Sequence, residues 1–544
     1  MPARARPARR HKWVPLALCF ALFALPLFVI HLPFLHLPFF WDELGQFIPT
    51  ALDLFRHGAW IAHSTTPNVH PPGVEAYLVL WYELFGYSIA ITRVAMLVLG
   101  SFGLLLTFLL AIRLSRGTPG APAFLPPLLL LASPLFFTQS MMAQLDMPAM
   151  VFTLLALLLF LREQYAAAAA ASVVLVLTKE TGLVAPFVFF LALVAQKKWR
   201  RASYFVAPAA ALGLWLIVLH NGTGYWLGNP GFAHYNVGYA LHPVHVAFSF
   251  VRRFYYLFIA EFRWIGLVAL LLALRNRATR RVFHSPAWRV TIAVAAAQIV
   301  LVSVLGGAEL ERYLLPVLPL FYIAVSIALA AFRRRVSFAA TAALVAGLVA
   351  CLFWNPPYPF PYEDNLAMVD FVHLQQIAAR FAERNLSGDT IATAWPYTSA
   401  LEHPAYGFVH RPLKAIETND FHFDSIRAVP PSRFNVLIAY TRTWTPKGGA
   451  IAIPFVRRFL RHFYQWQPEI TAAQCASLGL DPLVSWRLHG QQITIYIRKH
   501  TPVSSGRVKA SSEKPGMGGY GKDHDLADSA PGLVREGSCG MRGT

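Results

Sequence analysis

The chain has 544 residues, of which 56% are hydrophobic, and its mean hydropathy is +0.47. Its apolar residues gather in blocks close to the roughly 20 residues that a helix needs to cross a bilayer, which excludes an ordinary soluble protein. The formal net charge of +20 lies in short basic clusters between these blocks. That distribution is typical of the cytoplasmic loops of membrane proteins and speaks against nucleic-acid binding.

The apolar blocks predict a polytopic α-helical membrane protein with about eleven spans. If the basic N-terminus is inside, every basic cluster falls on the cytoplasmic side, and the odd number of spans leaves the following segment outside. Glu261 and Arg263 interrupt the eighth span, so residues 244–262 could instead lie along the interface as an amphipathic helix. The predicted spans are 13–34, 90–112, 122–138, 147–161, 166–178, 181–196, 203–219, 254–274, 288–305, 313–331 and 336–354.

Residues 1–354 are therefore predicted to form a transmembrane domain, and two further regions lie outside the bilayer. The first external loop, 35–89, is much longer than a connector needs to be, and loops of that length are usually functional. Residues 355–500 have a mixed composition that predicts a C-terminal extracytoplasmic α/β domain, with helical periodicity at 366–381. Strand-like runs follow at 390–394, 435–440 and 492–497.

Residues 501–544 are rich in Gly, Ser, Lys and Asp and poor in apolar residues. A segment of that composition cannot bury enough apolar surface to fold, so a disordered tail is predicted.

Polar residues mark the first external loop. Asp42 and Glu43 directly follow the first span, where a carboxylate pair is either a hydrophilic stop or a functional pair. His70 begins the rigid turn Pro71-Pro72-Gly73. An imidazole there can hydrogen-bond, titrate or bind a metal, although a single histidine is more often a satisfied polar residue. Arg93 opens the second span.

The order of these pieces resembles the GT-C membrane glycosyltransferases, above all the protein O-mannosyltransferases and the lipid A aminoarabinose transferases. In that family an Asp-Glu pair follows the first span, and a Gly-Trp step, a Lys/His-Pro-Pro turn and a Phe-Gly-x-Ser segment before an Arg come next. Later in the chain come a second acidic loop, in which an Asp is followed by a small residue or Pro, a Lys-Glu/x-x-Gly loop, and an Arg-Tyr-Leu-x-Pro stretch. The matching pieces here are Asp42-Glu43, Gly58-Ala59-Trp60, His70-Pro71-Pro72, Phe85-Gly86-Tyr87-Ser88 with Arg93, Gln144 to Pro148, Thr178 to Gly182, and Glu311 to Pro319.

The resemblance covers about residues 1–330 and implies a membrane glycosyltransferase. Such an enzyme moves a hexosyl or pentosyl group from a polyprenyl-phosphate donor to a lipid, glycan or protein acceptor on the non-cytoplasmic face. The acceptor must lose a proton as it attacks, which needs a carboxylate base, and the departing phosphate must be held by cations.

These demands assign roles to the matching residues. Asp42 is the expected general base, and Asp146 is expected to orient the acceptor or to bind a metal beside His70. The full predicted set is Asp42, Glu43 and Asp146 for catalysis, Lys179 and Arg312 for the donor phosphate, and His70, Arg93 and Tyr313 for contacts with acceptor, donor or metal. Lys179 and Arg312 have a second interpretation, as cations that anchor helix ends at lipid headgroups. No cofactor is assigned, and the need for a divalent metal is left open.

Two other functions stay open from the sequence. An oligosaccharide ligase of related architecture would transfer a whole glycan, and a transporter or flippase would place its charges near the bilayer midplane, often within internal repeats. Here the charges fall on external loops. The expected location is the bacterial inner membrane, with the site and the C-terminal domain outside and membrane lipids and the lipid-linked donor as partners. The sugar, the acceptor and the oligomeric state are not specified by the sequence.

Overall fold

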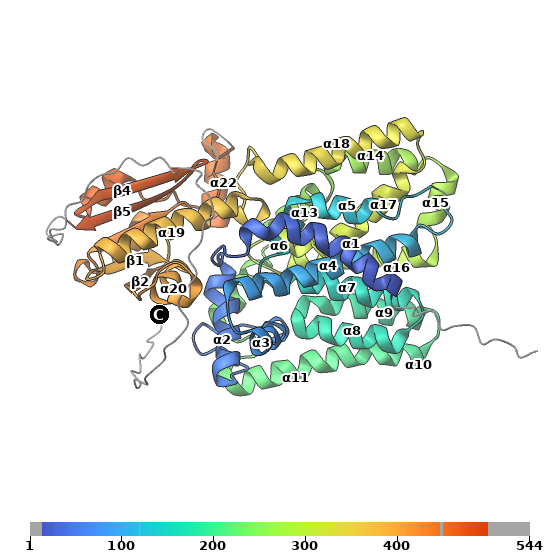
Figure 1. Cartoon of the computed structure of the whole chain (residues 1–544), viewed down its shortest axis with the longest axis horizontal. Helices are drawn as coiled ribbons and strands as arrows, with labels where there is room; N and C mark the ends of the chain where they lie inside the picture. The colour runs from blue at the N-terminus through green and yellow to red at the C-terminus, as the bar shows by residue number, and fades with distance from the viewer. Residues whose placement is uncertain (1–13, 119, 446–449, 499–544) are drawn as a thin grey trace, which may run out of the picture. The chain divides into compact units, whose positions relative to one another are not determined.

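The computed structural model describes residues 14–498, apart from residue 119 and residues 446–449. The described residues belong to one compact unit, in which a large helical part adjoins a smaller part built on a sheet (Figure 1). The tail predicted at 501–544 and the basic N-terminal arm lie outside the described residues.

Long apolar helices dominate the chain up to Phe353. Among the described residues, five are long and apolar enough to cross a membrane, and a bent helix pair makes up to six. The five are Leu16–Phe34, Ile89–Leu114, Trp199–Thr223, Pro286–Val304 and Arg334–Phe353. They comprise α1 (Val14–His31) with η1 (Leu32–Phe34), α4 (Ile89–Leu114), α10 (Trp199–Ala202) with η4 (Ser203–Phe205) and α11 (Val206–Thr223), α16 (Pro286–Val304) and α18 (Arg334–Phe353).

Shorter apolar helices occupy the other predicted spans. Every predicted span coincides with at least one helix, but several are below 18 residues, so the count of eleven spans stays a prediction. The shorter helices are α5 (Leu125–Ala132), α6 (Pro134–Gln139), α7 (Asp146–Leu161), α8 (Tyr165–Thr178), η3 (Glu180–Leu183) with α9 (Val184–Ala195), and α17 (Leu318–Leu329).

The predicted eighth span is a bent pair rather than one straight helix. Helices α13 (Pro243–Phe258) and α14 (Arg263–Ala273) meet at 86°. At the bend Glu261 and Phe262 have φ values of 53° and 63°, and Glu261 pairs with Arg263. Left-handed backbone cannot continue an α-helix, so the charges that interrupt the apolar pattern mark the break.

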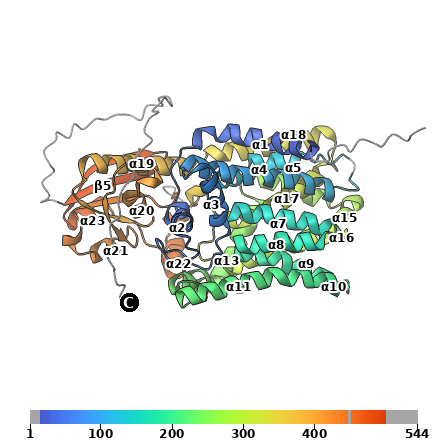
Figure 2. The same cartoon turned by 60° about the horizontal axis from the view of Figure 1, so that its bottom comes forward.

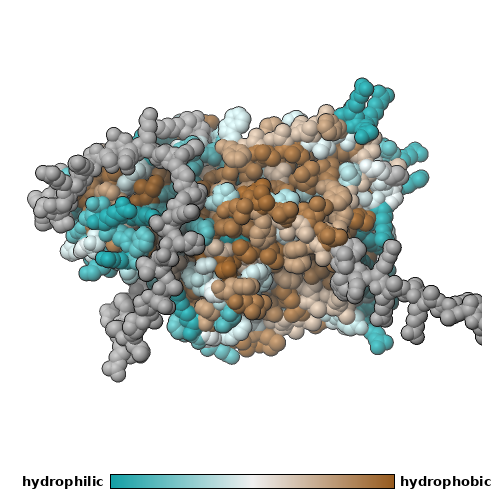
Figure 3. Space-filling model, in the orientation of Figure 1, coloured by the Kyte–Doolittle hydropathy of each residue, from teal (hydrophilic) through white to brown (hydrophobic). Residues whose placement is uncertain are grey.

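The surface of the helical part is a broad apolar zone, with hydrophilic residues towards both ends (Figure 3). Exposed apolar side chains such as Leu18, Leu25 and Leu214 belong to this zone, each at least 65% exposed. A surface of this kind is stable in contact with lipid, in agreement with an integral membrane protein.

The basic loops and the sheet lie at opposite ends of the helices. Helices α10 and α15 (Arg277–Phe283), which carry two of the basic clusters, lie at the end away from the sheet in both views (Figures 1 and 2). This arrangement agrees with the orientation predicted from the loops, in which the C-terminal part is on the side opposite to the basic loops.

The first external loop folds into short helices between the spans and the sheet (Figure 1). They are η2 (Glu43–Phe47), α2 (Ile48–His57) and α3 (Gly73–Phe85). The other short elements before the C-terminal part are α12 (Pro230–Ala233), η5 (His234–Tyr239) and η6 (Glu311–Leu314).

The C-terminal part is a five-stranded mixed sheet in the order β2-β1-β3-β5-β4. Strand β1 (Thr390–Ala394) is parallel to β2 (Lys414–Thr418) and β3 (Val436–Tyr440), whereas β5 (Gln491–Arg498) is antiparallel to β3 and β4 (Leu480–Leu488). The hairpin between β4 and β5 turns at His489 and Gly490, both with positive φ, as a two-residue turn requires.

Helix α19 (Ala367–Asn385) packs along this sheet and buries its apolar face against it. The predicted helix and the three predicted strands are confirmed, and β2 and β4 are additional. The remaining elements are η7 (Tyr362–Asp364), α20 (Tyr397–Glu402), η8 (Pro404–Tyr406), α21 (Phe423–Ala428), η9 (Pro431–Arg433), η10 (Ala450–Ala452), α22 (Pro454–Tyr464) and α23 (Ala472–Ser477).

Candidate functional site

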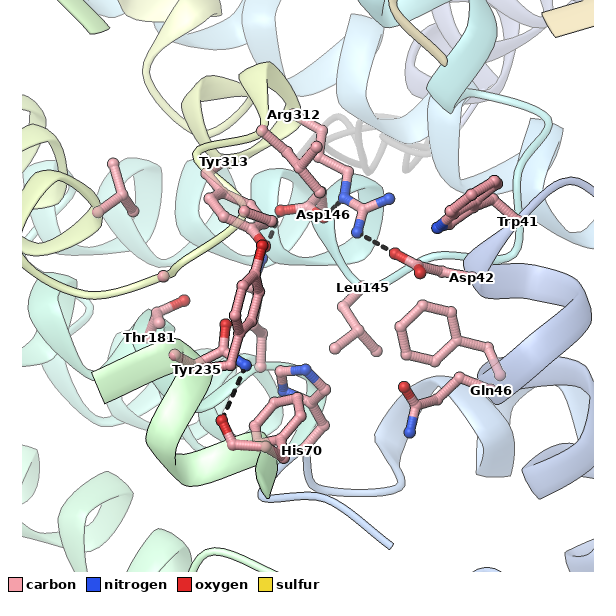
Figure 4. A pocket seen from close by; sticks show the side chains of 18 of the residues that line it. Trp41, Asp42, Gln46, His70, Leu145, Asp146, Thr181, Tyr235, Arg312 and Tyr313 are labelled. Atoms are coloured by element: carbon pink, nitrogen blue, oxygen red, sulfur yellow. Dashed lines mark hydrogen bonds and ion pairs between the residues drawn. The ribbon is translucent and has the colours of Figure 1, made fainter. Parts of the chain in front are cut away.

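A cavity of about 570 Å³ opens where the first loop, several helix ends and the start of the C-terminal part meet (Figure 4). Six of the eight predicted site residues line it: Asp42, His70, Asp146, Lys179, Arg312 and Tyr313. Arg312 and Tyr313 share η6 (Glu311–Leu314), and the other four come from the start of a helix or from connecting segments elsewhere in the chain. The fold therefore gathers residues that are far apart in the sequence at one end of the helices.

Arg312 is the centre of the charged residues in this cavity. Its guanidinium pairs with Asp42, as Figure 4 shows, and its Nε lies 3.1 Å from an Asp146 carboxylate oxygen. Its Nη1 donates hydrogen bonds of 2.7 Å to Gln144 and to Glu363. One guanidinium thus holds three carboxylates, and charge-assisted bonds of this kind are about twice as strong as neutral ones.

Lys179 adds a second cation. Its Nζ lies 2.5 Å from the other oxygen of Asp146 and 4.3 Å from the centre of the Tyr313 ring. Asp146 begins α7 and Lys179 directly follows α8, so two helix ends bring the pair together. Asp146 consequently bridges both cations.

The three carboxylates around Arg312 differ in exposure. The side chain of Asp42 is 20% exposed, against 4% for Asp146 and 3% for Glu363. Trp41, just before Asp42, has a φ of 40°, a left-handed conformation that is strained for a tryptophan. Such strain is common where the backbone must aim a functional side chain. Asp42 is the member of the trio that a molecule in the cavity can reach.

Glu363 was not predicted from the sequence, although it lies in the same arrangement. Its pKa is raised to about 7: burial is the largest cause, the charge of Arg312 opposes the rise, and the nearby Asp42 and Asp146 add to it. Arg312 itself stays charged: burial lowers its pKa, but the surrounding carboxylates more than compensate and hold it well above the usual value. The signal available in the sequence was the acidic pair Glu363-Asp364 after the last span, which repeats the Asp-Glu pair after the first.

Glu43 and Arg93 form a separate, fully buried ion pair, with both side chains 0% exposed and 2.5 Å between Oε1 and Nη1. Glu43 also accepts hydrogen bonds from the backbone N–H groups of Phe40 and Ala143. Arg93 donates to the backbone carbonyls of Leu37, Pro38 and Met141.

The two residues are not among the described residues that line the cavity. The pair instead joins the first loop to α4 and to the segment before Asp146. The structure therefore places these two predicted site residues behind the site rather than in it.

His70 pairs with Glu180 rather than with Asp146. Its Nδ1 lies 2.8 Å from Glu180 Oε2, and the two side chains are about one fifth exposed. Burial opposes ionisation of Glu180, but the charge and hydrogen bond of His70 and the charge of Lys179 lower its pKa to about 2. Whether Asp146 binds a metal beside His70 stays a prediction. Within the part of the chain that the structure describes, no group of three or more His, Cys, Asp or Glu could hold a metal ion.

The cavity also has residues that the sequence interpretation did not single out. Tyr235 lies between Tyr313 and His70 (Figure 4). The C-terminal part supplies Trp395, whose ring meets Trp41 edge-on, and Arg442, which lies 5.1 Å from the Trp41 ring. Residues so far apart in the sequence show no spacing pattern that could have revealed them.

Comparison with known proteins identifies relatives at the level of structure. No family model and no curated protein matches the sequence. The structure of ArnT from Cupriavidus metallidurans bound to undecaprenyl phosphate has 15% identity and a TM-score of 0.50, over 88% of this chain and 97% of that chain. The apo state of the same protein has 16% identity, with the same TM-score and coverage.

The archaeal oligosaccharyltransferase AglB from Archaeoglobus fulgidus, in complex with an inhibitory peptide and a dolichol-phosphate, gives 11% identity. Its TM-score is 0.47, over 79% of this chain and 70% of that chain. These structural neighbours are GT-C glycosyltransferases. The likeness to ArnT extends over most of both chains, so the resemblance predicted from the sequence is confirmed at the level of the fold.

Proposed function

We propose that the chain is an integral-membrane glycosyltransferase that transfers a sugar from a polyprenyl-phosphate carrier to an acceptor hydroxyl. The observation that carries the proposal is the arrangement around Arg312: one reachable carboxylate, Asp42, beside two cations in a cavity at the ends of the helices. The shared fold with ArnT, whose structure holds undecaprenyl phosphate, supports a lipid-phosphate donor. The acceptor belongs to a lipid, a glycan or a protein.

The reaction is a direct displacement at the anomeric carbon. The acceptor oxygen forms the new bond to that carbon as the bond to the carrier's phosphate oxygen breaks, and Asp42 takes the acceptor proton. Arg312 fixes the orientation of Asp42 by pairing with it. The carrier phosphate departs with the bonding electrons and gains negative charge, which nearby cations stabilise.

The two cations have different parts in this proposal. Lys179 donates one hydrogen to Asp146 and keeps two for phosphate oxygens, so it makes the direct contact. Arg312 already directs Nη1 to Gln144 and Glu363 and Nη2 to Asp42, so in this proposal it acts on the phosphate through its charge and through the position of Asp42. The sequence led to the expectation that both cations bind the phosphate directly, whereas in this proposal only Lys179 does so.

The location of the charges favours an enzyme over a transporter. Asp42 follows α1 and η1, Asp146 begins α7, and Lys179 follows α8. Transport sites instead lie near the bilayer midplane on broken helices. An oligosaccharide ligase would share these features, and a donor with a single sugar distinguishes it, because a ligase requires the assembled glycan.

The proposed site faces the non-cytoplasmic side of a bacterial inner membrane, because the basic clusters lie at the other end of the helices. Single cysteines at the exposed positions Ser387 and Arg277 test this in a background without native cysteines. We expect a membrane-impermeant thiol reagent to label Ser387→Cys in sealed cells and Arg277→Cys only after permeabilisation. The opposite pattern would contradict the orientation.

The decisive test is Asp42→Asn. The amide keeps the size of the carboxylate but cannot take the proton, so we expect a loss of about a hundred- to ten-thousandfold in turnover. Turnover is measured with a polyprenyl-phosphate-linked monosaccharide, and donor binding is measured in parallel to show an intact cavity. Glu43→Gln is the matched control and should lose less turnover per folded molecule than Asp42→Asn, since Glu43 does not line the cavity. Near-normal turnover in Asp42→Asn would refute the proposed base.

A further inference from the structure

A second cavity of about 410 Å³ adjoins the first and shares Tyr235 and Ala308 with it. Its volume is within the range of about 300–1,000 Å³ that is usual for small-molecule sites. Its walls come from η5, α13, the loop before η6 and the end of α22. None of the residues predicted from the sequence lines this cavity, and the mechanism proposed above does not use it.

Aromatic rings form one wall of the second cavity. Tyr235 and Tyr239 are nearly parallel, with an interplanar angle of 11° and ring centres 5.8 Å apart, and Tyr235 is 47% exposed. Tyr464, at the end of α22, also lines the cavity. A tyrosine presents a flat apolar face and a polar hydroxyl edge. A sugar ring has the complementary surface, since its C–H face stacks on aromatic rings and its hydroxyls point outward to polar groups.

Polar side chains complete the lining. Glu309 and Arg252 lie 3.9 Å apart, and the buried Nε of Arg252 has no hydrogen-bond partner among the described residues. Gln465 ends α22 beside Tyr464. Together these groups offer carboxylate acceptors, guanidinium donors and an amide that does both, which is the mixture that a ring of vicinal hydroxyls needs.

The backbone around this cavity is strained. Glu309 and Gln465 have φ values of 50° and 52°, which cost energy for residues with a side chain. A Cβ at Gly307 would clash with the backbone carbonyl of Tyr235, so this glycine allows the loop to approach η5 closely. Strained polar residues on two separate segments that face one cavity are typical of a functional site.

We infer that the second cavity is a saccharide-binding subsite that holds a sugar unit of the acceptor next to the reacting groups. Its polar and aromatic lining suits a sugar ring and disfavours a polyprenyl chain. Because it shares Tyr235 with the main cavity, a sugar held there lies beside the cavity in which Asp42 is exposed. The inference that this cavity binds a saccharide does not depend on the proposed function. The inference that the bound sugar belongs to the acceptor rests on that function.

Binding is tested by saturation-transfer NMR on the full-length protein in lipid nanodiscs free of glycosides. The probes are maltose, cellobiose and N,N′-diacetylchitobiose. We expect saturation transfer to at least one of them and a loss of most of that signal in Tyr239→Ala and in Gln465→Gly. Gln465→Gly removes the amide and relieves the left-handed strain, so it weakens binding without destabilising the fold. Phe455→Ala is the control, because Phe455 is on the same helix, 76% exposed and outside the cavity.

Absence of saturation transfer to all three probes would overturn the subsite, as would a signal that is unchanged in both cavity variants. The kinetics of sugar transfer then show whether the sugar bound in this cavity belongs to the acceptor or to the donor. A severalfold rise in KM for the acceptor in Gln465→Gly, with an unchanged KM for the donor, is the expected result. The reverse pattern would overturn the assignment to the acceptor. A parent protein that binds saccharide but transfers no sugar would contradict the proposed function and leave the subsite standing.

Discussion

Asp42 and Glu43 are neighbours in the chain, yet they belong to two different ion-pair systems. Asp42 pairs with Arg312 and keeps 20% of its side chain exposed in the cavity. Glu43 pairs with Arg93 in a region where both side chains are fully buried, and two backbone N–H groups satisfy it further. One carboxylate can meet a substrate and the other cannot, although the two differ by a single position.

The comparison shows that the partners and the exposure of a carboxylate, rather than its residue type, decide whether it takes part in the reaction or only holds the structure in place. A fully buried carboxylate that already accepts three hydrogen bonds from buried donors is out of reach of a substrate proton. Glu43 is therefore a positioning residue, since its bonds to Phe40 and Ala143 fix the segments that carry Asp42 and Asp146. Three variants test this division, beginning with the one of largest expected effect.

Arg93→Ala should destabilise the protein by about 3–5 kcal/mol, because it leaves the buried Glu43 charge without its partner. The expected result is a large loss of folded protein, measured as the yield of monodisperse protein and its thermal unfolding temperature in detergent. Arg93→Lys, which keeps a cation beside Glu43 but gives up most of the guanidinium's hydrogen bonds to backbone carbonyls, should lose less stability than Arg93→Ala. If Arg93→Ala has the stability of the parent but no activity, the buried pair belongs to the reaction and the comparison fails.

Lys179→Ala should act in the opposite way, on donor use rather than on stability. It removes a charge-assisted contact to the phosphate, at a cost of about 1.5–3 kcal/mol, which is roughly tenfold or more in kcat/KM at limiting donor. Lys198→Ala is the matched control, because Lys198 is a partly exposed lysine directly before α10, and α10 lies at the other end of the helices (Figure 1). Equal activity in the two variants would show that Lys179 does not contact the donor phosphate and only anchors a helix end at the membrane interface.

Glu363→Gln should have the smallest effect and should change the pH dependence. Because burial raises its pKa to about 7, Glu363 is neutral at low pH and gains a negative charge as pH rises through 7. That charge, next to Asp42 and Asp146, repels the donor phosphate. We therefore expect the KM for donor in the parent to rise severalfold from pH 6 to pH 8, and Glu363→Gln to remove the rise.

The stability of the folded protein is also expected to fall as pH rises. Since the pKa of Glu363 is raised by folding, its contribution is fully present below its ordinary pKa and is lost as pH rises through about 7. Arg312, Asp42 and Asp146 face Glu363 in the cavity, and Asp364 is adjacent to it. A pH profile of donor KM that is identical in parent and variant would show that Glu363 does not titrate in this range.

Hydrophobic periodicity was sufficient to predict a helix in each of the eleven apolar blocks and the positions of β1, β3 and β5, but not the apolar α3 within the first loop. It missed β2 and β4 because their alternation is weak: β4 contains Pro482, which is tolerated only because β4 is an edge strand. The bend between α13 and α14 was also beyond prediction. Charges in an apolar run indicate either a break or an interfacial helix, and the sequence alone does not decide between them; in the structure Arg263 bonds to Tyr256 and Glu261 across the bend.

The cavity could be predicted only in part. The order of motifs pointed to six residues that the structure brings together, because the ends of successive spans meet at one face of the membrane. Exposure was not predictable, so Asp42 and Glu43 could not be distinguished. Glu363 and Trp395 come from a region without recognisable motifs, and their proximity to Asp42 depends on how the C-terminal part packs on the helices.

The residues around Arg312 are also synthesised in a fixed order. Asp42 and Asp146 leave the ribosome first, Lys179 next, and Arg312 and Glu363 only when most of the membrane part has been made. Until then the early carboxylates have incomplete partners, and unpaired charges at membrane depth are costly. Completion of this cluster therefore coincides with the end of membrane insertion. A nascent chain stopped before residue 312 would leave Asp42 without Arg312, while Asp146 would still have Lys179; an unpaired acid at the helix ends is the kind of defect that membrane-protein quality control can recognise.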